Sequence, residues 1–194
     1  LIPALGAGGA ATLYRELLVA TLGRIAGAGL APLECCCAPD PRHPLFLQLQ
    51  RRHGLELSRQ QGCDLGGRME HAARIALQRA RMVVLIGGDC PGLDAAYVER
   101  ALAALRAGAD AVIGPAEDGG YVLLGLSRID GHLFRGMPWG SDRVLDETRQ
   151  RLRRLDWRWR ELEPLWDLDR PRDLARYRRL IRDAAAGRWP APAG

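Results

Sequence analysis

An aspartate stands directly after a short apolar run, where it is the first charged group. The run is Met82–Ile86, and it ends in Gly87-Gly88-Asp89-Cys90-Pro91. Val, Leu and Ile without a polar interruption indicate a strand buried on both faces of a sheet, and Pro91 prevents the strand from continuing. In open α/β sheets, ligands bind beyond the carboxyl ends of the strands. Asp89 is therefore a candidate ligand for a divalent cation that bridges phosphates, although turn chemistry alone also accounts for an aspartate in such a loop.

A second pair of acids stands late in the chain, in Trp166-Asp167-Leu168-Asp169-Arg170-Pro171. Alternate residues of an extended chain point to the same side, so both carboxylates face one way. Pro171 then suits the first turn of a helix. We predict that Asp167 and Asp169 complete the oxygen-rich cation site that Asp89 begins.

Two adjacent acids precede a pair of glycines in Glu117-Asp118-Gly119-Gly120-Tyr121, at an expected turn between two strands. This arrangement suits hydrogen bonds to sugar hydroxyls, or the activation of a water molecule by Asp118. We therefore expect Asp118 to be catalytic and its four neighbours to bind substrate. A plain Asp-Gly hairpin turn is the competing interpretation.

Glycines in the first turn of an expected helix mark a third segment, Gln61-Gly62-Cys63-Asp64-Leu65-Gly66-Gly67-Arg68. A glycine inside a helix costs about 1 kcal/mol relative to alanine. That cost is acceptable where a ligand approaches the helix N-terminus, whose free N–H groups favour anions. We expect Gly66 and Arg68 to contact substrate, and a loose loop is the alternative.

A fourth segment, Met137-Pro138-Trp139-Gly140-Ser141-Asp142-Arg143, combines an aromatic ring with a carboxylate and a guanidinium. Trp139 is suited to stack on an acceptor ring, and Asp142 is a second candidate catalytic acid. Arg143 can clamp a phosphate, as can Arg68. The alternatives are structural, because Ser141 and Asp142 are typical of a helix N-terminus and a tryptophan equally suits a core.

The composition removes several classes of chemistry. All 28 Lys+Arg residues are arginine, so neither Schiff-base chemistry nor a P-loop lysine is available. The five cysteines and four histidines lack zinc-site spacings, and no G-x-S-x-G motif supports a serine hydrolase. The net charge of +5 is modest, and most of the late arginines alternate with acids as on a solvated helix face. We expect no nucleic-acid partner.

The hydrophobic pattern predicts one domain over 1–194, because 194 residues with 47% hydrophobic content can bury one core. No apolar segment is long enough to span a bilayer, so we expect no membrane partner, and the free thiols fit a cytoplasmic setting. A homodimer is left open. The start, 1–11, lacks a methionine and a basic region and is not typical of a signal peptide. We expect that a first strand is missing before it.

Helical and strand patterns alternate along the chain. Amphipathic or capped stretches predict helices over 10–26, 45–52, 64–80, 94–108, 141–154 and 171–184. Short apolar or alternating runs predict strands over 33–37, 82–86, 109–113, 121–126 and 157–162. Asp64, Asp94 and Ser141 are the expected N-caps. Such alternation predicts a three-layer α/β/α domain with a mainly parallel, Rossmann-like sheet.

Four of these segments occur in the same order in one known family. They are Ile86–Leu93, Gly114–Tyr121, Trp139–Thr148 and Asp167–Leu174, and with Leu5–Leu22 the likeness covers nearly the whole chain. The sequence resembles an uncharacterised bacterial family of the nucleotide-diphospho-sugar transferase superfamily, which has the GT-A fold. Its members are labelled glycosyltransferases or radical-SAM/selenodomain-associated transferases.

The resemblance implies a metal site. In guanylyltransferases of molybdenum cofactor and phospholactate, and in sugar-acid cytidylyltransferases, a G-D-x-P aspartate and a later D-x-D-T-P-E-D-L aspartate hold Mg²⁺ against the nucleotide phosphates. By resemblance these roles fall on Asp89 and Asp169, with Asp167 as a helper and Mg²⁺ or Mn²⁺ as the ion. The sequence departs from the later motif at Arg170 and Arg172, where the family has Thr and Glu. In that family a strand and a Gly- and basic-rich loop that grip the nucleotide come first, and by resemblance we expect this sequence to begin after them.

The resulting expectation is a metal-dependent transferase that uses a nucleoside-diphosphate-sugar and an unknown small-molecule acceptor. Asp118 is then the candidate base for the acceptor hydroxyl. A nucleotidyltransferase of the guanylyl or cytidylyl type, using an NTP, is the first alternative, because both reactions share the metal arrangement. A non-catalytic nucleotide-binding or scaffold protein is the second.

Overall fold

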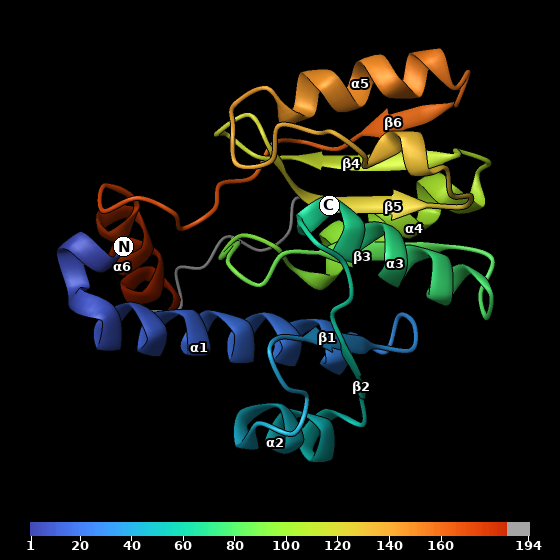
Figure 1. Ribbon diagram of the computed structural model, residues 1–194. Helices are drawn as coiled ribbons and strands as arrows, with labels where there is room; N and C mark the ends of the chain where they lie inside the picture. Colours follow the sequence, from blue (N-terminus) through green and yellow to red (C-terminus); the bar gives the residue numbers. More distant parts are fainter. Residues whose placement is uncertain (186–194) are drawn as a thin grey trace.

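Helices and strands alternate along residues 1–185, which the computed structural model describes (Figure 1). The helices are α1 (Ile2–Ala28), α2 (Pro44–His53), α3 (Leu65–Leu77), α4 (Ala95–Arg106), α5 (Val144–Arg154) and α6 (Asp173–Ala185), with a short 3-10 turn η1 (Gly131–Leu133). The strands are β1 (Glu34–Cys37), β2 (Glu56–Arg59), β3 (Val83–Ile86), β4 (Ala111–Pro115), β5 (Tyr121–Leu126) and β6 (Trp159–Glu161). Every element expected from the sequence is present, and β2 is added to them.

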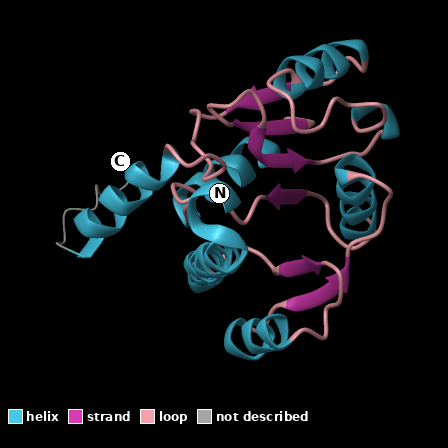
Figure 2. Cartoon of the chain, turned by 60° about the vertical axis from the view of Figure 1, so that its left-hand side comes forward, coloured by secondary structure: helices cyan, strands magenta, loops and turns pink. Residues whose placement is uncertain are grey.

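The strands form two sheets. The larger sheet has the order β3-β5-β4-β6, and β1 pairs with β2 in a separate parallel pair. β5 runs antiparallel to β3 and β4, whereas β4 and β6 are parallel. β3, β4 and β6 therefore share one direction and β5 runs against them, so two of the three pairings in this sheet are antiparallel and the sheet is mixed. The parallel pairs are β4–β6 and β1–β2. Figure 2 shows the four strands of the larger sheet stacked above the β1–β2 pair, with helices on either side.

The two faces of the larger sheet bury different side chains, because side chains of a strand alternate between its faces. On one face Val112 of β4 packs with α4 and with Ile25 of α1. On the other face Ala111 and Ile113 pack with α3 and α5, in a cluster that includes Leu152. The chain thus has helices on both faces of a sheet, which confirms the three-layer α/β/α architecture.

The start of α1 and the presence of β2 differ from the sequence-based expectation. α1 starts at Ile2 rather than at residue 10, with a kink where Gly6 adopts φ 67° and ψ 170°. Glycine without a Cβ permits this conformation, and the helix continues on both sides of it. β2 was not predicted because its four residues, Glu56–Arg59, contain one large apolar side chain and only partly bury their surface. Its pairing with β1 is a long-range contact that local pattern does not reveal.

The expected N-caps are confirmed at two helices and wrong at a third. Asp64 Oδ1 accepts the Gly67 N–H at 2.7 Å, and Asp94 Oδ1 accepts the Tyr97 N–H at 2.8 Å. α5, however, begins only at Val144. The Ser141 hydroxyl donates to the Pro138 carbonyl at 2.8 Å, so it closes the preceding turn instead of capping the helix.

Two further expectations need adjustment. Pro171 precedes α6, which begins at Asp173, instead of lying in its first turn. β3 is only partly buried along its length, because within residues 1–185 it pairs on one edge alone, with β5. None of the helices in the part of the chain described is both long and apolar enough to cross a bilayer.

The β4–β5 hairpin depends on a glycine for steric reasons. Gly119 has φ 94°, and a Cβ at this position would lie 2.2 Å from the Asp142 carbonyl oxygen. The Gly119 carbonyl also accepts the Leu145 N–H at 2.9 Å, so the turn cannot move away without losing that bond. The hairpin is therefore tied to the loop that precedes α5.

We predict that Gly119→Ala lowers the free energy of unfolding by at least about 2 kcal/mol, since it adds a backbone clash to a positive φ. Gly140→Ala is the matched control, because Gly140 has φ 80° but open space around its Cβ position. The control should lose only about 1 kcal/mol. Urea unfolding measures both, and equal losses would show that the clash is relieved by relaxation.

Candidate metal centre

An extended segment before α6, Leu165–Leu168, runs beside the end of β4. The Leu165 N–H donates to the Pro115 carbonyl at 2.9 Å, and the Leu165 carbonyl accepts the Glu117 N–H at 2.9 Å. Ala116 and Leu165 form an isolated parallel bridge. These backbone bonds place the segment directly beside the residue that precedes Asp118.

The same segment also contacts the loop after β3. The Leu168 N–H donates to the Asp89 carbonyl at 3.1 Å. Burial raises the pKa of the Cys90 thiol to about 12, so the thiol keeps its proton. The S–H group donates a hydrogen bond to the Trp166 carbonyl, at 3.3 Å. The ends of β3 and β4 are thereby joined through a stretch of chain that is far from both in sequence.

Side chains alternate along this segment as the sequence predicts. Trp166 and Leu168 are buried, with Leu168 only 2% exposed, and they pack against Leu17 of α1. Asp167 and Asp169 occupy the positions between and after them and point to the other side. The buried pair therefore anchors the segment, and the acidic pair is presented together.

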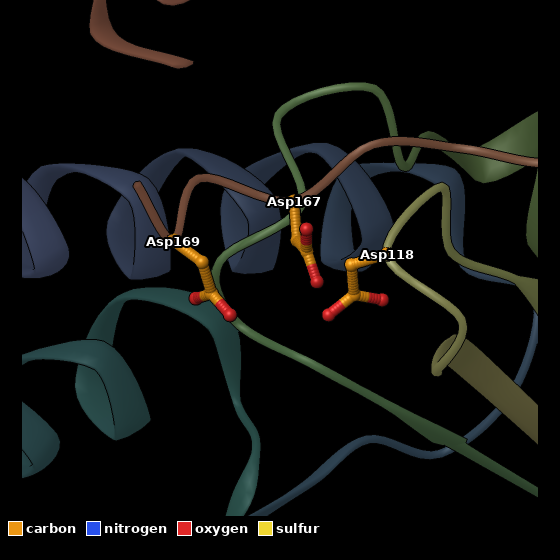
Figure 3. A group of neighbouring side chains, drawn as sticks. All are labelled: Asp118, Asp167 and Asp169. Carbon is orange, nitrogen blue, oxygen red and sulfur yellow. The ribbon is translucent and has the colours of Figure 1, made fainter. Parts of the chain in front are cut away.

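Three carboxylates meet at this point. Asp118, Asp167 and Asp169 each offer an oxygen, and these oxygens lie within 4.8 Å of one another. Figure 3 shows the three side chains converging in front of α1, with Asp118 coming from the hairpin and the other two from the segment before α6. Asp118 Oδ1 also accepts the Gly120 N–H at 2.9 Å, which fixes its orientation.

Asp89 lies beside this trio and is not one of its members. Its carboxyl turns back over its own loop, since a Cβ on Gly87 would lie 2.8 Å from Asp89 Oδ1. Its charge nevertheless acts on Asp167, and the charges of Asp118 and Asp169 act on it in turn. The predicted approach of Asp89 to Asp169 is therefore seen, and the sequence did not predict Asp118 as the third oxygen donor.

The cluster is electrostatically unfavourable by itself. Burial, followed by the charges of Asp118 and Asp169, raises the pKa of Asp167 to about 6. Burial also raises the pKa of Asp89, and the charge of Asp169 adds to the effect. Like charges at close range disfavour ionisation of both partners.

Within residues 1–185, no side-chain cation pairs with these carboxylates, and the N-terminal ammonium donates to the backbone carbonyl of Asp169, at 3.4 Å. Among residues 1–185, none of the ion pairs includes Asp89, Asp118, Asp167 or Asp169. The chain has 28 basic residues against 23 acids, so guanidinium groups are abundant elsewhere. Four aspartates without a guanidinium partner in such a chain point to a cation from outside.

The donor set fits a hard divalent ion. Three aspartate oxygens from two segments suit Mg²⁺ or Mn²⁺, which prefer carboxylate and water ligands, whereas a thiolate- or imidazole-seeking metal would find no ligand in the trio. The predicted metal ligands Asp167 and Asp169 belong to it, and Asp89 is within electrostatic reach. These residues can therefore hold an ion of the expected kind.

Glu117, a predicted substrate ligand, is engaged by another residue of the chain. Its carboxylate accepts two hydrogen bonds from Arg176 of α6, at 2.7 and 3.0 Å. These bonds hold the pKa of Glu117 below its usual range. Glu117 thus faces α6 and not the carboxylate trio.

Tyr121, the first residue of β5, contacts Trp139 of the loop before α5. Their rings meet edge to face, with centroids 6.3 Å apart and an interplanar angle of 83°. Burial raises the pKa of the Tyr121 hydroxyl, which contacts Thr148. Both rings pack against the core cluster on the α3–α5 face. The structural alternative considered for Trp139 therefore has a concrete basis in this packing.

Gly66 has a packing reason for lacking a side chain. A Cβ there would lie 2.5 Å from Trp139 Nε1, and that indole N–H is buried without a hydrogen-bond partner. The close approach that the sequence indicated at this helix start is thus made by the chain itself. Arg68 points elsewhere, to a cavity of about 290 Å³ between α3 and β1–β2, where it contacts Gln60 at 3.3 Å.

Asp142 and Arg143 lie next to the hairpin but outside the trio. Both are exposed in the turn before α5, and the Asp142 backbone is in contact with Gly119. α5 begins at Val144, so Asp142 precedes the helix and does not lie in its first turn.

Two residues near the site carried no sequence signal. Tyr14 of α1 is 51% exposed, and its hydroxyl lies 3.5 Å from the Cβ position of Gly88. Burial and the charge of Asp89 raise the pKa of its hydroxyl. Arg176 is one of several arginines of α6. Neither could be separated from its neighbours by type or spacing.

Comparison with known proteins identifies the family. Residues 21–141 match the family model described as "Uncharacterized protein conserved in bacteria (DUF2064)". The chain belongs to this family. A similar crystal structure, that of a "putative nucleotide-diphospho-sugar transferase" from Desulfovibrio desulfuricans G20, is 31% identical over 97% of this chain and 84% of that one, with a TM-score of 0.81.

More distant structures share the fold. A cytidylyltransferase from Leptospira borgpetersenii serovar Hardjo-bovis is 12% identical, with a TM-score of 0.55 over 76% of this chain and 64% of that one. A 4-diphosphocytidyl-2C-methyl-D-erythritol synthase is 14% identical, with a TM-score of 0.57 over 84% of this chain and 89% of that one. No curated protein sequence matches the chain.

The raised pKa of Asp167 leads to a stability prediction for the DUF2064 protein without metal. Asp167→Asn should raise the free energy of unfolding by about 1 kcal/mol at pH 8 in EDTA, a value reduced for the partial solvent access of the carboxyl. Because folding raises this pKa above its ordinary value of 3.8, protonation of Asp167 stabilises the folded wild type below about pH 3.8, and this gain is lost as the pH rises through about 6.

The difference between the variant and the wild type should therefore disappear near pH 4. Asp142→Asn is the control, because this exposed carboxyl lies outside the trio. Thermal and urea unfolding across pH 4–8 measure the effect. A variant no more stable than the control at pH 8 would contradict the electrostatic account.

Proposed function

We propose that this DUF2064 protein is a metal-dependent transferase that takes a nucleoside-diphosphate-sugar as donor. The proposal is supported by the similar structure at 31% identity, which is named a "putative nucleotide-diphospho-sugar transferase", and by the fold shared with the cytidylyltransferases. The observation that carries it is the carboxylate trio at the C-terminal end of the sheet, where α/β proteins bind ligands, with no ion-pair partner for the trio among residues 1–185.

Asp118, Asp167 and Asp169 would hold Mg²⁺ or Mn²⁺, and Asp89 would add its charge from beside the trio. The ion supplies charge neutralisation of a diphosphate, which makes it a better leaving group. Asp118 was a candidate base for the acceptor hydroxyl. Its place in the trio supports a ligand role in this proposal.

The residues around the trio have separate roles. The backbone bonds of Leu165–Leu168 keep the acidic side chains in position before any ligand arrives, so little ordering is needed on binding. Arg143 remains a candidate for a phosphate contact, since it is exposed in the turn beside the hairpin. Arg68 was also predicted to contact phosphate, but it lines the separate cavity between α3 and the β1–β2 pair. The edge-to-face contact of Tyr121 with Trp139 packs the start of β5 against the loop before α5.

Titration calorimetry with UDP-sugars, GTP and CTP, each with and without Mn²⁺, tests the proposal. We expect heat with a nucleotide-sugar that depends on the ion. Heat with none of these ligands would support a non-catalytic scaffold. Product analysis separates the two reactions, since release of a nucleoside diphosphate indicates glycosyl transfer and release of pyrophosphate indicates nucleotidyl transfer.

We predict that Asp169→Asn and Asp89→Ala each weaken ion-dependent nucleotide binding, with a larger loss for Asp169, which belongs to the trio. A missing carboxylate ligand should lower the affinity by about tenfold or more. Asp142→Asn is again the control and should bind as the wild type does. Calorimetry and circular dichroism together check binding and folding, and unchanged affinity in Asp169→Asn would reject the metal role.

A further inference from the structure

The three carboxylates of the trio come from two separate segments, and they repel one another. Asp118 is on the β4–β5 hairpin, whereas Asp167 and Asp169 are on the segment before α6. Backbone hydrogen bonds of Leu165 join the two segments. A side chain from α6 also contacts both segments.

That side chain is Arg176, and its first contact is with the hairpin. Its two terminal nitrogens donate to the two carboxylate oxygens of Glu117, at 2.7 and 3.0 Å. A two-pronged guanidinium–carboxylate pair restricts orientation as well as distance. Glu117 directly precedes Asp118, so the position of the Asp118 backbone is coupled to this pair.

The second contact is with the segment before α6. The Arg176 guanidinium lies over the Trp166 ring, with its central carbon 4.5 Å from the ring centroid. Trp166 is buried and directly precedes Asp167. A planar guanidinium can stack on an aromatic ring and hold a carboxylate at its edge at the same time, which an ammonium group cannot do equally well.

Arg176 belongs to a helix, α6, that packs against α1. Leu174 of α6 is buried with Leu17 of α1, and Tyr177 packs against the same cluster. Figure 1 shows α6 lying against the first half of α1. Arg176 stands between these two α6 residues in sequence.

We infer that Arg176 is a positioning residue that fastens the two acid-bearing segments to each other and so prepares the trio for a cation. This inference rests on the proposed function for the existence of the ion. An exposed ion pair alone contributes little to stability. Here its effect would be on the spacing of Asp118 relative to Asp167 and thus on ion binding.

The sign of the effect separates this role from simple electrostatics. A guanidinium near a cation site repels the cation, so removing Arg176 would raise ion affinity if charge alone mattered. A positioning role gives the opposite result. We expect Arg176→Gln to lower Mn²⁺ affinity by roughly fivefold, the effect of one good charge-assisted pair.

The experiment measures Mn²⁺ binding to the full chain by calorimetry at pH 7.5. Arg178→Gln is the matched control, since it removes the same charge from the same helix without touching Glu117 or Trp166. Glu117→Gln should lower the affinity as Arg176→Gln does, the double variant should lose no more than either single variant, and Arg176→Lys should recover only part.

Hydrogen exchange of the peptide spanning 116–121 provides a readout without metal. We expect faster exchange in Arg176→Gln and Glu117→Gln than in the wild type or in Arg178→Gln. Equal or higher Mn²⁺ affinity in Arg176→Gln, or unchanged exchange, would overturn the inference. Failure of the proposed function would show differently, as absence of Mn²⁺ binding by the wild type.

Discussion

The site depends on the backbone pairing of Leu165–Leu168 with two strand ends at once. This pairing brings carboxylates from distant parts of the sequence into a space where they repel one another. Asp167 and Asp169 do not stabilise this arrangement. The buried side chains of Trp166 and Leu168 stabilise it by packing on α1, because burial of apolar surface favours the segment's position whatever the charge beside it. The core thus offsets the electrostatic cost that the acids introduce.

Much of the fold could be predicted from the sequence, because local patterns determine most of it. Capping aspartates such as Asp64 and Asp94 act within three residues, and apolar runs such as that of β3 identify strands directly. β2 and the late start of α5 were missed for the opposite reason. β2 exists through its pairing with β1, and the turn at Ser141 is set by a hydrogen bond to Pro138 that no sequence pattern distinguishes from a cap.

The candidate site divides in the same way. Asp89, Asp167 and Asp169 could be singled out, since their positions relative to an expected strand and helix were unusual for acids. The grouping of Asp118 with the last two depends on how the hairpin meets the chain before α6, which is a tertiary contact. Arg176 gave no signal at all, because α6 carries several arginines and only packing selects the one that reaches Glu117.

Trp166 and Leu168 alternate with Asp167 and Asp169, and this alternation sets the distance between the two aspartates. In an extended chain the step between every second residue is fixed by the peptide geometry, at about 6.6 Å. The separation of the two carboxyl-bearing α-carbons is therefore a property of the main chain, and only the short aspartate stems adjust it. A glutamate at either position would carry its carboxylate past that of the other residue. The length of the acidic side chain therefore matters here as much as its charge.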